Sequence, residues 1–190
     1  MNVYDFDNTI YKGESSLDFF IYCLKQNPKQ LKFMPAVIFT LIKYKMCIIT
    51  ADELIKTGEK FALEFINNIK NIDTVTKDFW DKHQHKIKDF YLKNQKSDDC
   101  IISASPSFVL NEIAKRLNVK HLICSEVDKE TGKIIQLCFS DAKPKLFKQT
   151  CPDAFIDCFY TDSMNDKPMI EISKSAYLVT GNKIRKIKGD

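Results

Sequence analysis

The segment Asp5-Phe6-Asp7-Asn8-Thr9 follows directly on a short apolar lead, Val3-Tyr4, at the start of the chain. This order predicts that two carboxylates emerge where a buried strand ends, which is the end of the strands where ligands bind in open α/β sheets. Carboxylates this close repel each other, and a fold tolerates them when a cation or a shared proton relieves the repulsion. One acid could attack phosphorus while the other moves a proton, with a divalent metal neutralising the cluster. The alternative interpretation is a solvated turn, because Asp and Asn favour turns.

The composition is that of an ordinary folded chain. Its 190 residues are enough for one core with an inserted subdomain, and 44% of them are hydrophobic. The net charge of +4 is small and Lys alternates with acidic residues, so we expect no nucleic-acid partner. The seven cysteines contain no C-x-x-C pair, which favours a reduced, cytoplasmic setting over a disulfide framework.

Two features bear on membranes. The start of the chain does not resemble a signal peptide, because Asp5 and Asp7 occupy what would be its apolar core. The apolar stretch 33–49 contains one proline and two lysines, and its uncharged part, 33–42, is too short to span a bilayer. We expect a buried or interfacial helix there, which allows membrane contact but not an integral span.

The hydrophobic pattern predicts an α/β protein. Residues 14–97 show helical spacing, whereas from residue 98 onward strand-like runs alternate with helices, as in a parallel sheet with right-handed crossovers. Helices are expected at 16–25, 33–49, 50–66, 73–92, 105–117, 143–149 and 168–173. Strands are expected at 1–4, 100–102, 119–124, 154–160 and 176–179, with a hairpin of 125–128 and 134–139 turning at 130–133 and a solvated edge strand at 183–188. We therefore predict an α/β core of residues 1–13 and 98–190 and a helical cap of residues 14–97.

Polar segments fall at the ends of several predicted strands. Asp5 and Asp7 follow the first strand, Ser103 follows the second, the acidic segment 162–166 follows a later one, and Lys143 begins a helix. Each has an unremarkable explanation alone: Ser103 as a helix cap, Lys143 as a surface lysine, and 162–166 as a loop. Because the carboxyl ends of parallel strands share one edge, together they predict one pocket.

On these residues the chain resembles the haloacid dehalogenase (HAD) superfamily of phosphohydrolases, whose four motifs occur here in order. The motifs are Asp5-Phe6-Asp7-Asn8-Thr9, Ser103, Lys143 and Asp162-Ser163-Met164-Asn165-Asp166. The resemblance is closest to the phosphoserine-phosphatase-like (HAD-IB) branch, which carries a helical C1-type cap and a Ser-Ala-Ser-Pro second motif, here at 103–106. It implies a Rossmann-like core with an inserted cap and an enzyme that hydrolyses phosphate monoesters.

The resemblance also implies residue roles. Asp5 would be the nucleophile that forms an aspartyl-phosphate, and Asp7 would act as the general acid and base. Lys143 would compensate charge. Lys145, two residues away, is a rival for this role, but Lys143 is preferred because Leu146 and Phe147, three and four positions later, would form an inward helix face with it. An acid at Asp7 favours a phosphatase over a dehalogenase, which has no leaving alkoxide to protonate. Mg²⁺ would be held by Asp5, the Asp7 carbonyl and Asp162, with support from Asp166. The phosphate or the rest of the substrate would be bound by Thr9, Ser103, Ala104, Asn165 and Glu14.

The substrate is left open by the sequence. Glu14 lies where phosphoserine phosphatases carry a glutamate that meets the substrate amine. However, no arginine occurs between residues 1 and 115 to hold a carboxylate, and the double glycine after Ser103 is missing. The apolar stretch 33–49 favours a larger ester, such as a lipid-linked or membrane-proximal phosphate. The alternatives are phosphoserine phosphatase or another small amino- or sugar-phosphate phosphatase, and a catalytically inactive HAD-fold binding module. We expect a monomer or homodimer.

Overall fold

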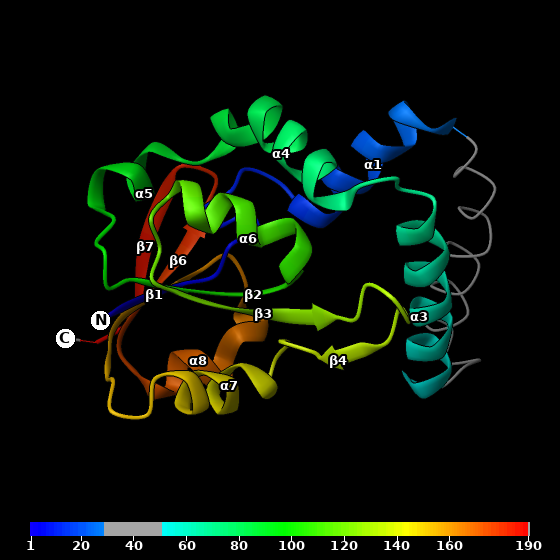
Figure 1. Cartoon of the computed structure of the whole chain (residues 1–190). Coiled ribbons are helices and arrows are strands. Elements are labelled where there is room, and N and C mark those ends of the chain that lie inside the picture. The colour runs from blue at the N-terminus through cyan, green and yellow to red at the C-terminus, as the bar shows by residue number, and fades with distance from the viewer. Residues whose placement is uncertain (29–50, 190) are drawn as a thin grey trace.

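The computed structural model describes residues 1–28 and 51–189, which form a seven-stranded sheet with helices on both faces (Figure 1). The sheet order is β4-β3-β2-β1-β5-β6-β7, with the antiparallel strands β4 and β7 at its edges and parallel pairing between. The strands are β1 (Asn2–Tyr4), β2 (Cys100–Pro106), β3 (His121–Val127), β4 (Ile134–Gln136), β5 (Ile156–Thr161), β6 (Ser173–Thr180) and β7 (Lys183–Lys188). The predicted α/β class with a parallel central sheet is confirmed.

The shortest parallel strand, β1, lies at the centre of the sheet. Val3 is in register with Cys100 of β2 on one side and with Phe159 of β5 on the other. The carboxyl ends of β1, β2 and β5 therefore lie side by side, and the segments that follow these strands are brought to the same edge. This arrangement positions the candidate site.

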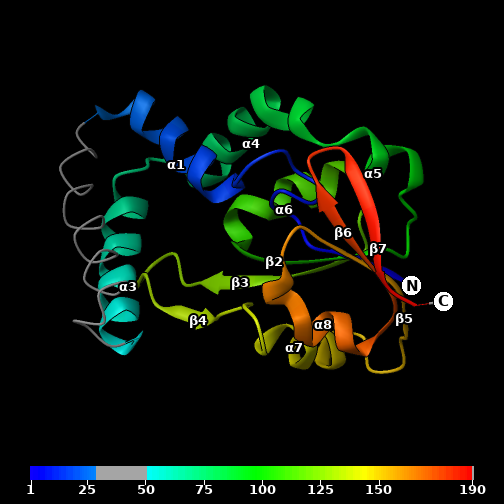
Figure 2. The ribbon, with the colours of Figure 1, turned by 180° about the vertical axis from the view of Figure 1, so that it is seen from behind.

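Two layers of helices cover the sheet (Figures 1 and 2). On one face lie α1, α4, α5 and α6, and on the other lie α7 and α8, while α3 stands farther out beside the β3–β4 hairpin. The helices are α1 (Ser15–Gln26), α3 (Ala51–Asn67), α4 (Ile72–His83), α5 (Asp89–Asn94), α6 (Ser107–Arg116), α7 (Ala142–Thr150) and α8 (Lys167–Ile172), with short 3₁₀ helices η2 (Gln84–Lys86) and η3 (Met164–Asp166). The helix expected at 33–49 lies outside the described residues.

The single helix expected over 73–92 was wrong, because the chain leaves the helix between α4 and α5. Ile87 forms an antiparallel bridge with Tyr11, and the Lys88 amide donates a hydrogen bond to the Ile10 carbonyl over 2.8 Å. Pairing with residues 10–12 replaces the intrahelical bonds, a competition that local periodicity does not reveal. Helix α6 also begins at Ser107, later than expected, because β2 continues through Pro106.

The described part of the segment 14–97 shares its apolar core with one face of the sheet. Phe19 of α1, Phe79 and Trp80 of α4 and Leu110 of α6 are all buried in one cluster. The Trp80 indole donates a 2.7 Å hydrogen bond to the Val109 carbonyl, which ties α4 to α6. A second cluster, including Phe147 and Met169, lies under α7 and α8 on the other face. The division into a core and a cap stays a prediction.

The β3–β4 hairpin reaches across to α3. Its turn lies within residues 128–133, which include the predicted turn 130–133, and Gly132 adopts a φ of +69°. A Cβ atom at Gly132 would lie 2.5 Å from the Leu63 Cβ, so only glycine permits this approach. The Ile134 amide donates a 3.0 Å hydrogen bond to the Glu59 carboxylate. Within the described residues, no helix combines the length and apolarity that crossing a membrane requires.

Candidate active site

A buried lysine joins two acidic segments at the sheet edge. Lys143 Nζ, in the first turn of α7, lies 2.9 Å from Asp5 Oδ1 and 2.8 Å from Asp166 Oδ1. The other oxygen of Asp166 accepts a 2.8 Å hydrogen bond from Thr161 at the end of β5. Asp5 directly follows β1, and its backbone amide donates to the Tyr160 carbonyl of β5. Segments more than a hundred residues apart thus meet at one cluster of charges.

The electrostatics of this cluster follow from its burial. Burial raises the pKa of Asp5 to about 7, and the positive charge of Lys143 opposes that rise. Burial also acts to lower the pKa of Lys143, but the charges of Asp5 and Asp166 outweigh it and raise the lysine pKa. We conclude that Lys143 stays protonated and favours the ionised form of Asp5, which is the form a nucleophile requires.

Asp7 lies in a separate polar arrangement. Its Oδ1 accepts a 2.6 Å hydrogen bond from the Ser15 amide, and its Oδ2 accepts a 2.6 Å bond from the Ser105 hydroxyl. Burial raises the pKa of Asp7, while the hydrogen bonds from Ser105 and Ser15 counteract it. The two aspartates of the first motif therefore have different partners: Asp5 has a cation, and Asp7 has neutral donors.

The structure brings the predicted phosphate-binding residues to the site to different degrees. Thr9 is fully buried, and its hydroxyl donates to Asp5 Oδ2 over 3.3 Å. Ser103 is buried as well, and its hydroxyl accepts a 3.1 Å bond from the Ser105 amide. Ala104 and Asn165 are exposed, so neither is part of the buried cluster.

Glu14 and Asp162 lie at the rim of the site. Glu14 is exposed just before α1 and accepts a hydrogen bond from the Asn8 side chain at 2.5 Å. Burial and the charges of Asp7 and Asp162 raise its pKa. Asp162 is half-buried, and its pKa is raised by burial and by the charge of Asp166. The charges of neighbouring carboxylates therefore add to burial in raising the pKa of both rim acids.

The two candidate lysines differ in their exposure to solvent. Lys143 is 3% exposed and carries the ion pairs to Asp5 and Asp166, whereas Lys145 is exposed on the opposite side of α7. The inward-facing partner expected four positions later, Phe147, is buried with Lys143. The geometry places Lys143, not Lys145, in the cluster.

Several residues of the site were not identified from the sequence. Ser105 and Ser15 bond Asp7, Thr161 holds Asp166, and the buried Lys88 donates to the carbonyls of Asn8 and Gly181. Ser105 stands inside the second motif, so its proximity to Ser103 was an available signal. Lys88 had no such signal, because it depends on the break between α4 and α5.

The oxygen donors fit a hard divalent cation. Across residues 1–28 and 51–189, no group of three or more His, Cys, Asp or Glu side chains is gathered as a metal site. The predicted set instead combines the carboxylates of Asp5 and Asp162 with the main-chain carbonyl of Asp7. Mg²⁺ binds one or two carboxylates and keeps several waters, so this donor set is chemically suited to it.

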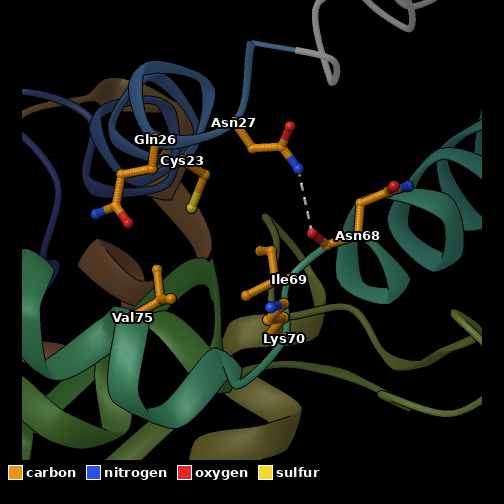
Figure 3. Close-up of a pocket in the computed structure, with 7 residues that line it drawn as sticks. All are labelled: Cys23, Gln26, Asn27, Asn68, Ile69, Lys70 and Val75. Atoms are coloured by element: carbon orange, nitrogen blue, oxygen red, sulfur yellow. Dashed lines mark hydrogen bonds between the residues drawn. The ribbon is translucent and has the colours of Figure 1, made fainter.

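Two cavities with both polar and apolar linings lie near the candidate site and at the end of α1. One of about 340 Å³ borders the site and is lined by Asn8, Lys88, Asp162 and Gly181, among others. Another of about 330 Å³ lies at the carboxyl end of α1, where Asn27 donates a 3.5 Å hydrogen bond to the Asn68 carbonyl (Figure 3). None of the predicted site residues lines this second cavity.

Comparison with known protein families identifies the family to which the chain belongs. A family model described as haloacid dehalogenase-like hydrolase matches residues 3–171, a range that contains all four motif segments. A comparison with curated proteins gave no match.

Solved structures show the same fold. A protein of unknown function from Bordetella pertussis Tohama I has 18% identity and a TM-score of 0.72, over 93% of this chain and 87% of that one. A phosphoserine phosphohydrolase-like protein from Francisella tularensis subsp. tularensis SCHU S4 has 19% identity and a TM-score of 0.53, over 93% and 86%. Cytosolic 5'-nucleotidase IIIB bound to cytidine has 16% identity and a TM-score of 0.55, over 90% and 68%. At these identities the similarity establishes the fold.

Proposed function

Because this chain belongs to the haloacid dehalogenase-like hydrolase family, we propose that it is a Mg²⁺-dependent phosphatase that hydrolyses a phosphate monoester through an aspartyl-phosphate on Asp5. Membership confirms the resemblance drawn from the motifs and the expected enzyme class, a hydrolase of this family. The observation that carries the proposal is the pairing of Lys143 with Asp5, beside an Asp7 held by hydroxyl and amide donors. We place the enzyme in the phosphoserine-phosphatase-like branch on its Ser-Ala-Ser-Pro motif.

In the first half of the reaction, an oxygen of Asp5 attacks phosphorus and the bond to the leaving alkoxide breaks. Asp7 gives its proton to that alkoxide, a transfer that requires the carboxyl to be protonated at the start. Burial raises the pKa of Asp7, which favours this protonated form. Thr9, Ser103 and the rim residues Glu14, Asn165 and Ala104 are proposed to bind the phosphate or the rest of the substrate.

In the second half, Asp7 accepts a proton from water as the water attacks the aspartyl-phosphate. Inorganic phosphate then leaves and the carboxylate of Asp5 is restored. Lys143 holds Asp5 through both halves and compensates negative charge on the phosphoryl oxygens. Asp166 keeps Lys143 in place through its 2.8 Å ion pair, and it is in turn fixed by Thr161.

Asp5, the Asp7 carbonyl and Asp162 are proposed to hold Mg²⁺, with Asp166 in support. Such an ion neutralises the non-bridging phosphoryl oxygens when bound. Burial is the main cause that raises the pKa of Asp5 and of Asp162, and the charge of Asp166 adds to it in both; a bound cation would offset this cost of holding the carboxylates ionised. A cytoplasmic location is supported by the cysteines: the six in the described residues are free, and five of these are buried.

The test is phosphate release from a panel of sugar, amino-acid and alkyl phosphates with Mg²⁺. Asp5→Asn is expected to lower kcat by about a thousandfold or more, because the amide cannot attack phosphorus. Asp153→Asn, which changes an exposed aspartate, is the matched control and should retain full activity. Chelation with EDTA should abolish the wild-type rate, and added Mg²⁺ should restore it. Unchanged activity in Asp5→Asn would overturn the enzymatic mechanism, and inactivity of the wild type on every ester would favour a binding module.

A further inference from the structure

A small apolar cavity of about 190 Å³ lies between α1, α3 and α6. One aromatic wall comes from each helix, with Phe19 on α1, Phe61 on α3 and Phe108 on α6. Among the described residues that line it, Ser16 alone has a polar side chain, and none is charged. The cavity therefore has the chemistry of a hydrocarbon site.

Two hydrogen bonds connect the lining of the cavity to the carboxyl that would protonate the leaving group. Ser16 lines the cavity, and the Ser16 hydroxyl is 2.6 Å from that of Ser105. Ser105 donates directly to Asp7 over a further 2.6 Å, and Pro106, the next residue, also lines the cavity. An alcohol whose oxygen is at Asp7 would therefore have this apolar space within a few bonds of the oxygen.

Size and polarity together define what fits. A cavity of roughly 150 Å³ lined by Leu, Ile and Phe is known to stay dry and to bind benzene. The cavity here is slightly larger than that, so a phenyl-sized group fits. An ammonium or carboxylate in the same place would lose its hydration without gaining a partner. The cavity thus disfavours the serine moiety of phosphoserine.

We propose that this cavity binds an apolar group of the leaving alcohol, so that the substrate class is a phosphate monoester with a phenyl-sized hydrocarbon group near the ester oxygen. A short arylalkyl alcohol and the first carbons of an alkyl chain share this chemistry. The inference rests on the proposed phosphatase function and adds to it the part of the substrate that is selected.

Binding of non-hydrolysable phosphonates tests the proposal without turnover. Calorimetry with Mg²⁺ would compare methyl-, butyl-, hexyl-, dodecyl- and benzylphosphonate on the wild-type chain. Benzylphosphonate is expected to bind tenfold or more tightly than methylphosphonate, the discrimination that an apolar pocket typically gives. A plateau in affinity at butyl or hexyl supports a small alcohol, whereas a continued rise to dodecyl supports a longer chain that extends past the cavity. Equal affinity across the series would overturn the proposal.

A cavity-filling variant gives an independent readout. Ala62 lines the cavity from α3, and Ala62→Phe is expected to lower the affinity for benzylphosphonate tenfold or more. Lys60→Phe adds the same ring at an exposed position of the same helix and should leave this affinity unchanged. Persistence of the wild-type preference in folded Ala62→Phe would contradict the assignment. If that variant does not fold by circular dichroism, the wild-type series alone decides.

The two proposals fail separately. Preferential binding of benzylphosphonate by a chain that releases phosphate from no ester would support the cavity and overturn the catalytic function. Active release with no preference for apolar groups, in binding or in kcat/KM, would overturn only the cavity.

Discussion

At the scale of single residues, Lys143 sets the charge balance of the candidate site. It is buried between Asp5 and Asp166, and each carboxylate would be an uncompensated charge without it. Removing one partner of a buried ion pair is costly because the remaining charge has lost both water and partner. A cluster with two acids and one lysine is therefore balanced only when a further cation binds or a proton is taken up.

The stability of the chain should depend on this lysine. Lys143→Met, measured in EDTA by urea unfolding near neutral pH, is expected to lose about 3 kcal/mol of unfolding free energy, because two buried carboxylates then face each other. Lys145→Met is the matched control on the same helix and is expected to change stability by no more than about 0.5 kcal/mol, because Lys145 is exposed. Equal effects of the two substitutions would contradict the assigned role of Lys143.

Ser105 is a positioning residue for Asp7. Its hydroxyl bonds the carboxylate oxygen that the Ser15 amide does not reach, and it links Asp7 to α1 through Ser16. Without this bond, only the Ser15 amide would hold the Asp7 carboxyl, which would fix its orientation toward the leaving oxygen less firmly. Proton donation matters for an alkoxide, which is a poor leaving group, and much less for nitrophenolate.

Ser105→Ala should therefore reduce kcat/KM for an alkyl phosphate about tenfold more than for p-nitrophenyl phosphate. A purely structural role would lower both rates equally. Ser107→Ala supplies the comparison, because Ser107 is a buried serine two residues away that bonds Glu126 instead of Asp7. A leaving-group dependence in Ser107→Ala equal to that in Ser105→Ala would remove the argument.

At the scale of elements, the β3–β4 hairpin and α3 depend on each other. The tip of the hairpin approaches α3 so closely at Gly132 that no side chain fits, and Glu59 of α3 accepts the Ile134 amide. Lys129 at the same tip pairs with Asp73 of α4 over 2.9 Å. The hairpin therefore positions a wall of the apolar cavity, since α3 carries Phe61 and Ala62.

Comparing Gly132→Ala with Gly181→Ala distinguishes the stability lost through the contact with α3 from the stability lost through backbone strain. Gly181→Ala is the control, because Gly181 has a φ of +59° but a Cβ added there would meet no atom within 4 Å. We expect about 1 kcal/mol of destabilisation for Gly181→Ala from strain alone, and about 1–3 kcal/mol more for Gly132→Ala from the clash with α3. Urea unfolding measures the totals, and faster amide exchange in residues 56–67 of Gly132→Ala would locate the effect. Equal losses would show that the hairpin does not hold α3.

At the scale of the whole molecule, the helical segment and the sheet share a core. Trp80 of α4 is completely buried beside Phe6 and Tyr11, and it hydrogen-bonds to α6. Phe19 of α1 joins the same cluster. A sheet face stripped of these helices would expose its apolar side chains to water, so the face and its helices should fold together.

Unfolding should accordingly occur in a single transition. Trp80 is the only tryptophan in the chain, so its fluorescence reports on α4, while far-UV circular dichroism reports on all elements. The two urea curves are expected to coincide in midpoint and slope. A fluorescence midpoint at lower urea than the dichroism midpoint would show instead that the segment 14–97 unfolds as a separate domain.

Much of this arrangement was predictable because it depends on local order. Buried strands show as short apolar runs, and the residues at their ends share an edge in any parallel sheet, so Asp5, Ser103 and the acids of 162–166 could be placed together. The hairpin turn at Gly132 could also be predicted from the sequence, since a turn is specified by a few adjacent residues.

The tertiary structure decided what depends on contacts between distant segments. It bonded Ser105 and Ser15 to Asp7, it ended α4 where Ile87 pairs with Tyr11, and it supplied the two carboxylate partners of a lysine that helical spacing had only favoured. It also assembled an apolar cavity from three helices. Periodicity cannot reveal these features, because a side chain's partner across the fold is set by packing and by the pairing of buried polar groups. The motifs by themselves indicated the family and the chemistry expected of it, whereas the apolar cavity exists only because α1, α3 and α6 pack together, and the leaving group that we propose for it depends on that packing.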